Sequence, residues 1–232
     1  IRDSEFSVTN EVVQKERFRY FIKVPELAAF YNEITDYRTA ADVGIDRPEL
    51  DEELCQIPMT DDQQAFLDKL VLFAKTGDPE HIGRADLSDG EVKALMLLVT
   101  MYSNKLSLDM RLISPAYADS PGNKASRSAA NIAEYYRRYE DQKGTQMVFC
   151  DLSTPHGDGK FNVYDDVRDK LIARGIPAEE IAYIHSAETE AKKKELFGKV
   201  RSGQIRVLLG STQKMGAGTN VQQKLIALHH LD

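Results

Sequence analysis

The sequence predicts an α/β fold, with a parallel sheet and flanking helices in the C-terminal half and a mainly helical region before it. After residue 121, short apolar runs alternate with helical patterns of about 10–15 residues, which is typical of a parallel sheet with crossover helices. Before that point, apolar residues recur mainly at helical spacing. The Pro- and Gly-containing run 119–123 marks the expected boundary, so the predicted regions are 1–120 and 121–232.

The N-terminal region contains three predicted helical segments. In the first, between Phe18 and Tyr37, Pro25 suits an opening helical turn, and apolar residues follow at helical spacing: Leu27, Phe30, Tyr31 and Ile34. Residues 42–60 form a connector, and the second helix covers residues 61–75 before a stop at Gly77. The sequence 88–91 predicts a capping box that opens one continuous helix to about Ser107. This third helix is expected to bury Val92, Leu95, Met96, Leu98 and Val99.

The C-terminal region alternates between helix and strand. Helices are predicted over 125–141, 163–173 and 187–201, with Ser186 as the cap of the last and Gly203 as its stop. Apolar runs predict strands over 146–150, 181–184, 205–209 and 225–229. Because ligands of parallel sheets bind beyond the carboxyl ends of the strands, functional residues are expected in the loops that follow these runs.

The bulk composition describes an ordinary globular chain of 232 residues, 42% hydrophobic and 29% charged. A net charge of -7 and a pI of about 5.4 argue against a generally basic nucleic-acid-binding protein, although a local basic stripe is still compatible with them. Cys55 and Cys150 lack metal-ligand spacing and are expected to be buried thiols. No membrane span or signal peptide is expected, and the first residue, Ile1, suggests a piece of a larger protein.

Two glycine-containing sequences match nucleotide-binding loops only in part. In Gly157-Asp158-Gly159-Lys160, Thr154 and Phe161 occupy positions where a phosphate loop needs Gly and Ser or Thr, so a solvated turn is expected. Gly216-Ala217-Gly218 has Val221 in place of the third glycine of a dinucleotide loop. No apolar run ends in the adjacent acidic residues that would hold Mg²⁺.

The longer segment 209–222 resembles motif V of Snf-type ATPases of helicase superfamily two, in which a strand leads into Ser-Thr, a glycine-rich turn and Gly-x-Asn. Three other segments match that family in order and spacing: 147–151 (motif IV), 184–186 with the charged helix after it, and 228–232. The resemblance covers residues 124–232. It is closest to the large helicase–DNA methylase proteins of bacterial mobile elements and phages, whose linker after the first lobe the segment 17–27 also resembles.

The resemblance implies a RecA-like C-terminal lobe that ends before motif VI, within a cytoplasmic bacterial DNA helicase or translocase. ATP and Mg²⁺ would be held by an N-terminal RecA-like lobe of the same parent chain, which would also contain a methylase region. Three residues are expected at the nucleotide edge between the lobes: Gly216, Gly218 and Asn220. Three are expected on the DNA backbone: Ser211, Thr212 and Lys214. No catalytic residue, metal site or bound cofactor is expected in this chain alone.

Two alternatives remain open at this point. The first is a non-catalytic DNA-binding or scaffold module with a helicase-like lobe, and the second is a Rossmann-type nucleotide-binding enzyme. The histidines near strand ends, His185, His229 and His230, are expected to be structural. The aromatic residues are expected to pack between helices rather than to stack on bases: Phe18, Tyr20, Phe21, Phe30, Tyr31, Tyr135, Tyr136 and Tyr139.

Overall fold

The computed structural model describes residues 2–6, 12–16, 22–39, 41–44, 49–155, 157, 159–216 and 219–232. The chain forms two compact units, residues 1–56 and residues 57–232. The sequence predicted a boundary at residue 120, between a helical region and an α/β region. The division into compact units rests on contacts and not on the type of secondary structure, so this boundary stays a prediction. Within the described residues, no helix combines the length and the apolar character needed to cross a bilayer.

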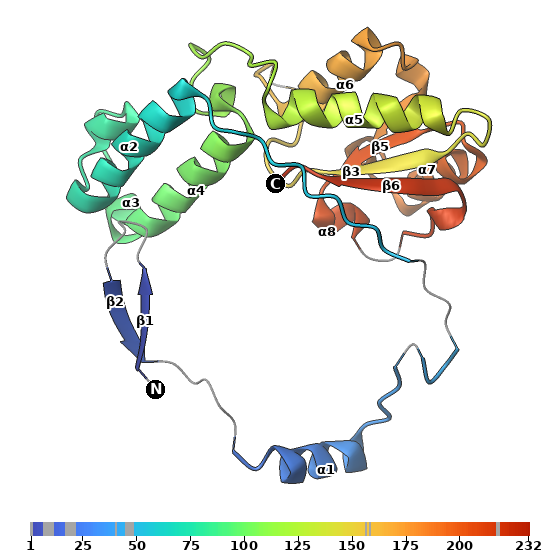
Figure 1. Cartoon of the computed structure of the whole chain (residues 1–232), viewed down its shortest axis with the longest axis horizontal. Coiled ribbons are helices and arrows are strands. Elements are labelled where there is room, and N and C mark those ends of the chain that lie inside the picture. The colour runs from blue at the N-terminus through green and yellow to red at the C-terminus, as the bar shows by residue number, and fades with distance from the viewer. Residues whose placement is uncertain are drawn as a thin grey trace. The chain divides into compact units, whose positions relative to one another are not determined.

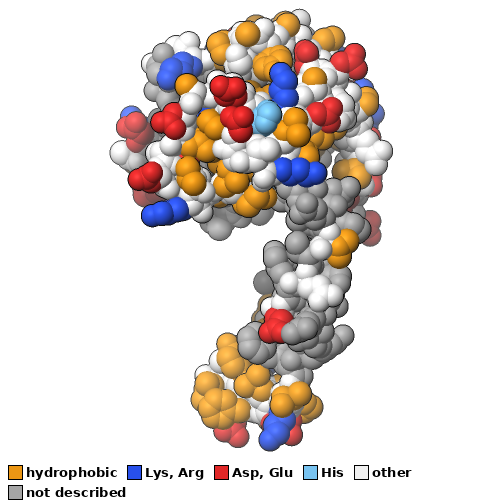
Figure 2. All heavy atoms as spheres, turned by 90° about the vertical axis from the view of Figure 1, so that its left-hand side faces the viewer, with side chains coloured by type: hydrophobic (Ala, Val, Ile, Leu, Met, Phe, Trp, Pro, Cys, Tyr) orange, Lys and Arg blue, Asp and Glu red, His pale blue; other side chains and the backbone are white. Residues whose placement is uncertain are grey.

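The described residues of the first unit form a hairpin and a helix. Strands β1 (Arg2–Phe6) and β2 (Val12–Glu16) pair antiparallel, and α1 covers Val24–Ile34. The hairpin was not predicted, because its short strands mix apolar and charged residues without regular alternation. Helix α1 confirms the first predicted helix, with Pro25 in its opening turn. Apolar side chains gather on the surface of α1 (Figure 2), where Phe30 and Tyr31 are exposed instead of packed between helices. Phe18, Tyr20 and Phe21 lie outside the described residues.

The second unit begins with a helical part. Helix α2 (Asp61–Thr76) opens with a capping box between Thr60 and Gln63 and ends at Gly77, which adopts the left-handed φ of 72° that glycine tolerates best. The longer helix α4 (Leu95–Leu108) and three short ones follow: η1 (Pro79–Ile82), α3 (Asp89–Lys93) and η2 (Met110–Leu112). They enclose a small core of buried residues: Phe66, Leu70, Phe73, Ile82, Leu98, Val99, Leu106 and Met110.

The capping box at Ser88 is confirmed, but the continuous helix predicted after it is wrong. The backbone of Ala94 leaves the helical region, with φ -108° and ψ 29°, and separates α3 from α4. Because of this break, Val92 in α3 does not share one apolar stripe with the buried Leu98 and Val99 of α4, and it is exposed. Met96, in the first turn of α4, is exposed as well.

The C-terminal part of the second unit is an α/β layer structure, as predicted. Its sheet consists of four parallel strands in the order β4-β5-β3-β6. The strands are β3 (Thr145–Phe149), β4 (Ile181–Tyr183), β5 (Val207–Gly210) and β6 (Leu225–His230). The fold is consistent with a RecA-like lobe. The first two strands of this sheet in chain order, β3 and β4, are separated by β5, whereas the corresponding strands of a dinucleotide-binding sheet are neighbours.

Helices cover both faces of this sheet (Figure 1). Helices α5 (Lys124–Arg138) and α6 (Val163–Ala173) pack on one face, against Val148, Val207 and Leu209. Helices α7 (Glu190–Ser202) and α8 (Thr212–Met215) pack on the other, against Met147, Phe149 and Leu208. Successive residues of each strand point alternately to these two faces of the sheet, as side chains of a strand must. Three short helices complete the fold: η3 (Ala178–Glu180), η4 (Ile184–Ser186) and η5 (Gln222–Lys224).

Two local predictions in this part need correction. Helix α7 begins at Glu190, where the Thr189 hydroxyl accepts a hydrogen bond from the Lys192 amide, and not at residue 187. Ser186 instead donates its hydroxyl to the Tyr183 carbonyl, so it is not the helix cap. The predicted stop at Gly203 is confirmed, with φ 80°. Cys150 is a buried free thiol, but Cys55 is exposed.

Candidate functional site

The topology places a candidate site at the carboxyl ends of β3 and β5. These strands are neighbours, yet the chain leaves β3 towards α6 on one face and leaves β5 into α8 on the other. In open α/β sheets, ligands bind in the crevice formed where adjacent connections diverge in this way. We call the residues after the four strands on this side the carboxyl edge. The described residues of Gly157–Lys160 lie in the β3–α6 connection.

The turn after β5 is attached to β3 by a carboxylate. Ser211 occupies the N-cap position of α8 without capping it through its side chain. Instead, Asp151, directly after β3, accepts a hydrogen bond from the Thr212 amide at 2.7 Å. A carboxylate at a helix N-terminus is favourable because it faces unpaired amide groups and the positive end of the helix dipole.

Asp232 makes a second connection at the same edge, between β6 and β3. Its carboxylate accepts hydrogen bonds from the backbone amides of Asp151 at 2.9 Å and Leu152 at 2.6 Å. Three adjacent strands, β5, β3 and β6, are therefore joined beyond their ends by carboxylate-to-amide bonds. The sequence resemblance included Asp151 and Asp232 but assigned neither a role.

The turn after β5 needs its glycines for close packing. A Cβ atom on Gly210 would lie 2.5 Å from Ile184 Cγ2 and 2.6 Å from Met215 Sδ. On Gly216 it would lie 2.6 Å from the Thr212 carbonyl oxygen. The φ of Gly216 is -72°, which any residue can adopt, so close packing and not a positive φ requires glycine at this position. Sequence reasoning passed over Gly210, although a glycine that closes a buried strand signals close packing. Gly218 lies outside the described residues.

The other residues predicted for the site lie together on this turn. Thr212, Lys214, Gly216 and Asn220 are exposed, whereas Ser211 is largely buried. The Asn220 carbonyl accepts a hydrogen bond from Arg201 Nη1 at 2.8 Å, and Thr219 donates its hydroxyl to the Met215 carbonyl at 2.7 Å. The described part of the turn is therefore held at both ends while it presents a cationic and a hydroxyl side chain to solvent.

Two histidines at the end of β6 face opposite sides of the sheet. His229 Nε2 lies 2.8 Å from Gln146 Oε1, and the ring meets Tyr135 edge to face. Burial, together with the neighbouring His230, lowers the pKa of His229 to about 4, so this ring is neutral at pH 7. His230 is exposed and stacks on Phe149.

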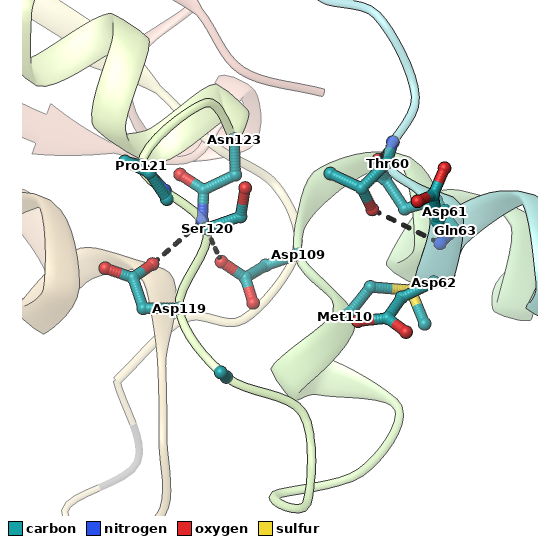
Figure 3. Close-up of a pocket in the computed structure, with 11 residues that line it drawn as sticks. Thr60, Asp61, Asp62, Gln63, Asp109, Met110, Asp119, Ser120, Pro121 and Asn123 are labelled. Carbon is teal, nitrogen blue, oxygen red and sulfur yellow. Dashed lines mark hydrogen bonds between the residues drawn. The ribbon is translucent and has the colours of Figure 1, made fainter.

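A separate acidic cavity of about 420 Å³ lies between the start of α2 and the segment 118–123 (Figure 3). Asn123 donates hydrogen bonds to Asp109 and Asp119 there. Oxygens of Asp109, Asp119 and Asp166 lie within 4.8 Å of one another, a spacing that would suit a metal ion.

Two cations already neutralise these carboxylates. Arg111 lies 2.8–3.0 Å from all three of them, and Lys170 lies 3.0 Å from Asp119. The guanidinium of Arg111 also covers the ring of Phe161 at 4.1 Å. We therefore interpret this cluster as an ion-pair network that attaches the helical part to α6, and we place the candidate site at the carboxyl edge.

Comparison with known proteins adds one finding. A family model described as a probable helicase domain matches residues 1–39, which include β1, β2 and α1. No curated protein and no solved structure matches the chain. The chain is thus similar to a helicase domain over its first 39 residues, and its C-terminal part is an α/β structure of the RecA-like kind.

Proposed function

We propose that residues 124–232 act as the second motor lobe of an ATP-dependent DNA helicase or translocase of the Snf-type branch. The observation that supports this most is the position of the turn after β5. It lies at the carboxyl edge of a parallel sheet, joined to the neighbouring strand through Asp151, and it exposes Thr212 and Lys214. The sequence resemblance over 124–232 and the helicase match over 1–39 point to the same class of protein.

The turn suits contact with a nucleic-acid backbone. A lysine ammonium and a threonine hydroxyl both donate hydrogen bonds to phosphate oxygens, and such contacts position a strand without reading its sequence. The turn is fixed by Asp151 and by the bond from Arg201 to Asn220, so Thr212 and Lys214 move with the sheet. When the whole lobe moves, its contacts with the DNA strand through Thr212 and Lys214 therefore move with it.

In this proposal ATP and Mg²⁺ are held by a first RecA-like lobe of the parent protein. Closure of the two lobes brings Gly216, Gly218 and Asn220 to the nucleotide, and hydrolysis releases the closed state. A methylase region in the same parent chain and a bacterial cytoplasmic location follow from the sequence resemblance and form part of the proposal.

DNA binding by the 232-residue chain tests the role of the turn. We expect Lys214→Gln to weaken binding of a labelled partial duplex in fluorescence anisotropy and to reduce the slope of log K against log salt by about one. Lys143→Gln is the matched control, because Lys143 is also exposed but precedes β3 at the opposite, amino edge of the sheet. Equal effects of the two substitutions, or no DNA binding by the wild-type chain, would contradict the proposal.

A further inference from the structure

The end of β6 presents a preformed aromatic surface. The rings of His230 and Phe149 are stacked, with centroids 4.9 Å apart and planes within 7° of parallel. The strand register pairs these two residues directly. Phe149 is 8% exposed, whereas His230 is exposed. Because the phenyl ring covers one face of the imidazole, the accessible surface of His230 is its other face and its edge.

This surface lies on the same side of the sheet as the turn after β5. Phe149 belongs to the hydrophobic cluster on the face of the sheet that α7 and α8 cover. That cluster also contains Met215 and Val221, the buried residues at either end of the turn. Strands β5 and β6 both neighbour β3, so their carboxyl ends are two strand spacings apart, roughly 10 Å. That distance corresponds to about three nucleotides at the duplex rise of roughly 3.4 Å each, and to fewer in a more extended strand whose bases are unstacked. A strand bound along this edge therefore passes from the end of β5 to the end of β6, where His230 lies, within a few nucleotides.

We infer that His230, supported by Phe149, is a stacking platform for an unpaired base of the DNA strand held by the turn after β5. The inference rests on the proposed function and specifies its substrate as a strand with unstacked bases. Histidine is among the aromatic side chains on which such bases stack, and stacking tolerates any sequence because every base has a π face. The support from Phe149 orients the imidazole before binding, which lowers the entropy lost on association.

The absence of tryptophan from the sequence allows a direct test. His230→Trp introduces a single indole, and we expect its fluorescence to be quenched by an oligothymidine strand but not by a blunt-ended duplex of two complementary strands or by ATP. His81→Trp, in η1 of the helical part, is the control and should not respond. In anisotropy measurements His230→Ala should bind the strand roughly five- to a hundredfold more weakly, and His230→Phe should bind like the wild type.

The outcomes separate this inference from the function on which it rests. Binding that depends on Lys214 but not on His230, with no quenching of the indole, would overturn the platform and leave the motor-lobe proposal standing. Quenching by ATP alone would assign the surface to a free nucleotide and would also overturn it. Failure of the wild-type chain to bind any DNA would overturn both. Circular dichroism and melting temperature of His230→Ala distinguish a lost base contact from a folding defect, and His230→Phe tests whether an aromatic ring on Phe149 is sufficient for binding.

Discussion

Replacement of Arg111 by methionine removes the cation that joins three aspartates of the second unit. The Arg111 side chain is 14% exposed, and it pairs with Asp109, which is 2% exposed, as well as with Asp119 and Asp166. Methionine keeps much of the length of the side chain but leaves the Asp109 carboxylate buried without its ion-pair partner. Loss of one partner from a buried pair costs about 3–5 kcal/mol.

The lower end of this range applies here, because hydrogen-bond donors remain around Asp109. Its carboxylate still accepts from the Asn123 side chain at 2.8 Å and from the amide of residue 111 at 2.9 Å. We therefore expect a loss of about 3 kcal/mol in the free energy of unfolding. For a unit of this size, that loss lowers the melting temperature by about 6–12 °C.

Thermal unfolding followed by circular dichroism measures this effect. Arg138→Met is the matched control, since Arg138 is 54% exposed and pairs with Glu134, which is 58% exposed. Its loss should cost less than about 1 kcal/mol. The double variant Arg111→Met/Asp109→Asn should recover part of the loss, because it removes the buried charge left behind. Melting temperatures of the two single variants within about 2 °C of each other would refute the reasoning.

Three further predictions concern the sheet and its edge. The pKa of His229 is lowered to about 4 in the folded chain, so protonation of this ring favours the unfolded chain. The free energy of unfolding should therefore be highest above pH 6.5 and fall by up to about 3 kcal/mol as the pH drops from 6.5 to 4. Urea titrations should show this pH-dependent loss reduced in His229→Gln, and identical pH profiles would contradict it. Gly210→Ala should destabilise the chain by about 1–3 kcal/mol and weaken DNA binding, because its methyl group collides with Ile184 and Met215. Gly122→Ala, which meets no atom within 4 Å, is the control, and equal melting temperatures would count against close packing. Under the two-lobe proposal the isolated chain should hydrolyse no ATP, and a measured turnover would exclude that proposal.

Local features of this protein were determined by the sequence alone. The capping box at Ser88, the helix stops at Gly77 and Gly203 and the approximate positions of the four strands of the sheet all follow from side chains within a few residues of one another. Such contacts form in the same way whatever the rest of the chain does. The α/β class followed from them, because alternating strands and helices have few ways to bury their apolar faces.

The site itself was decided by contacts between distant segments. The insertion of β5 between β4 and β3 brings Asp151 to Thr212, 61 positions away, and the pairing of β6 with β3 places His230 on Phe149. The contacts of Arg206 were likewise decided by the tertiary structure. Within an apolar run it is buried at 1% exposure, with its guanidinium over Tyr136 and hydrogen-bonded to the Gly144 carbonyl. A hydrogen bond or a stack across strands depends on which strands are neighbours, and no spacing within one segment of sequence encodes that choice.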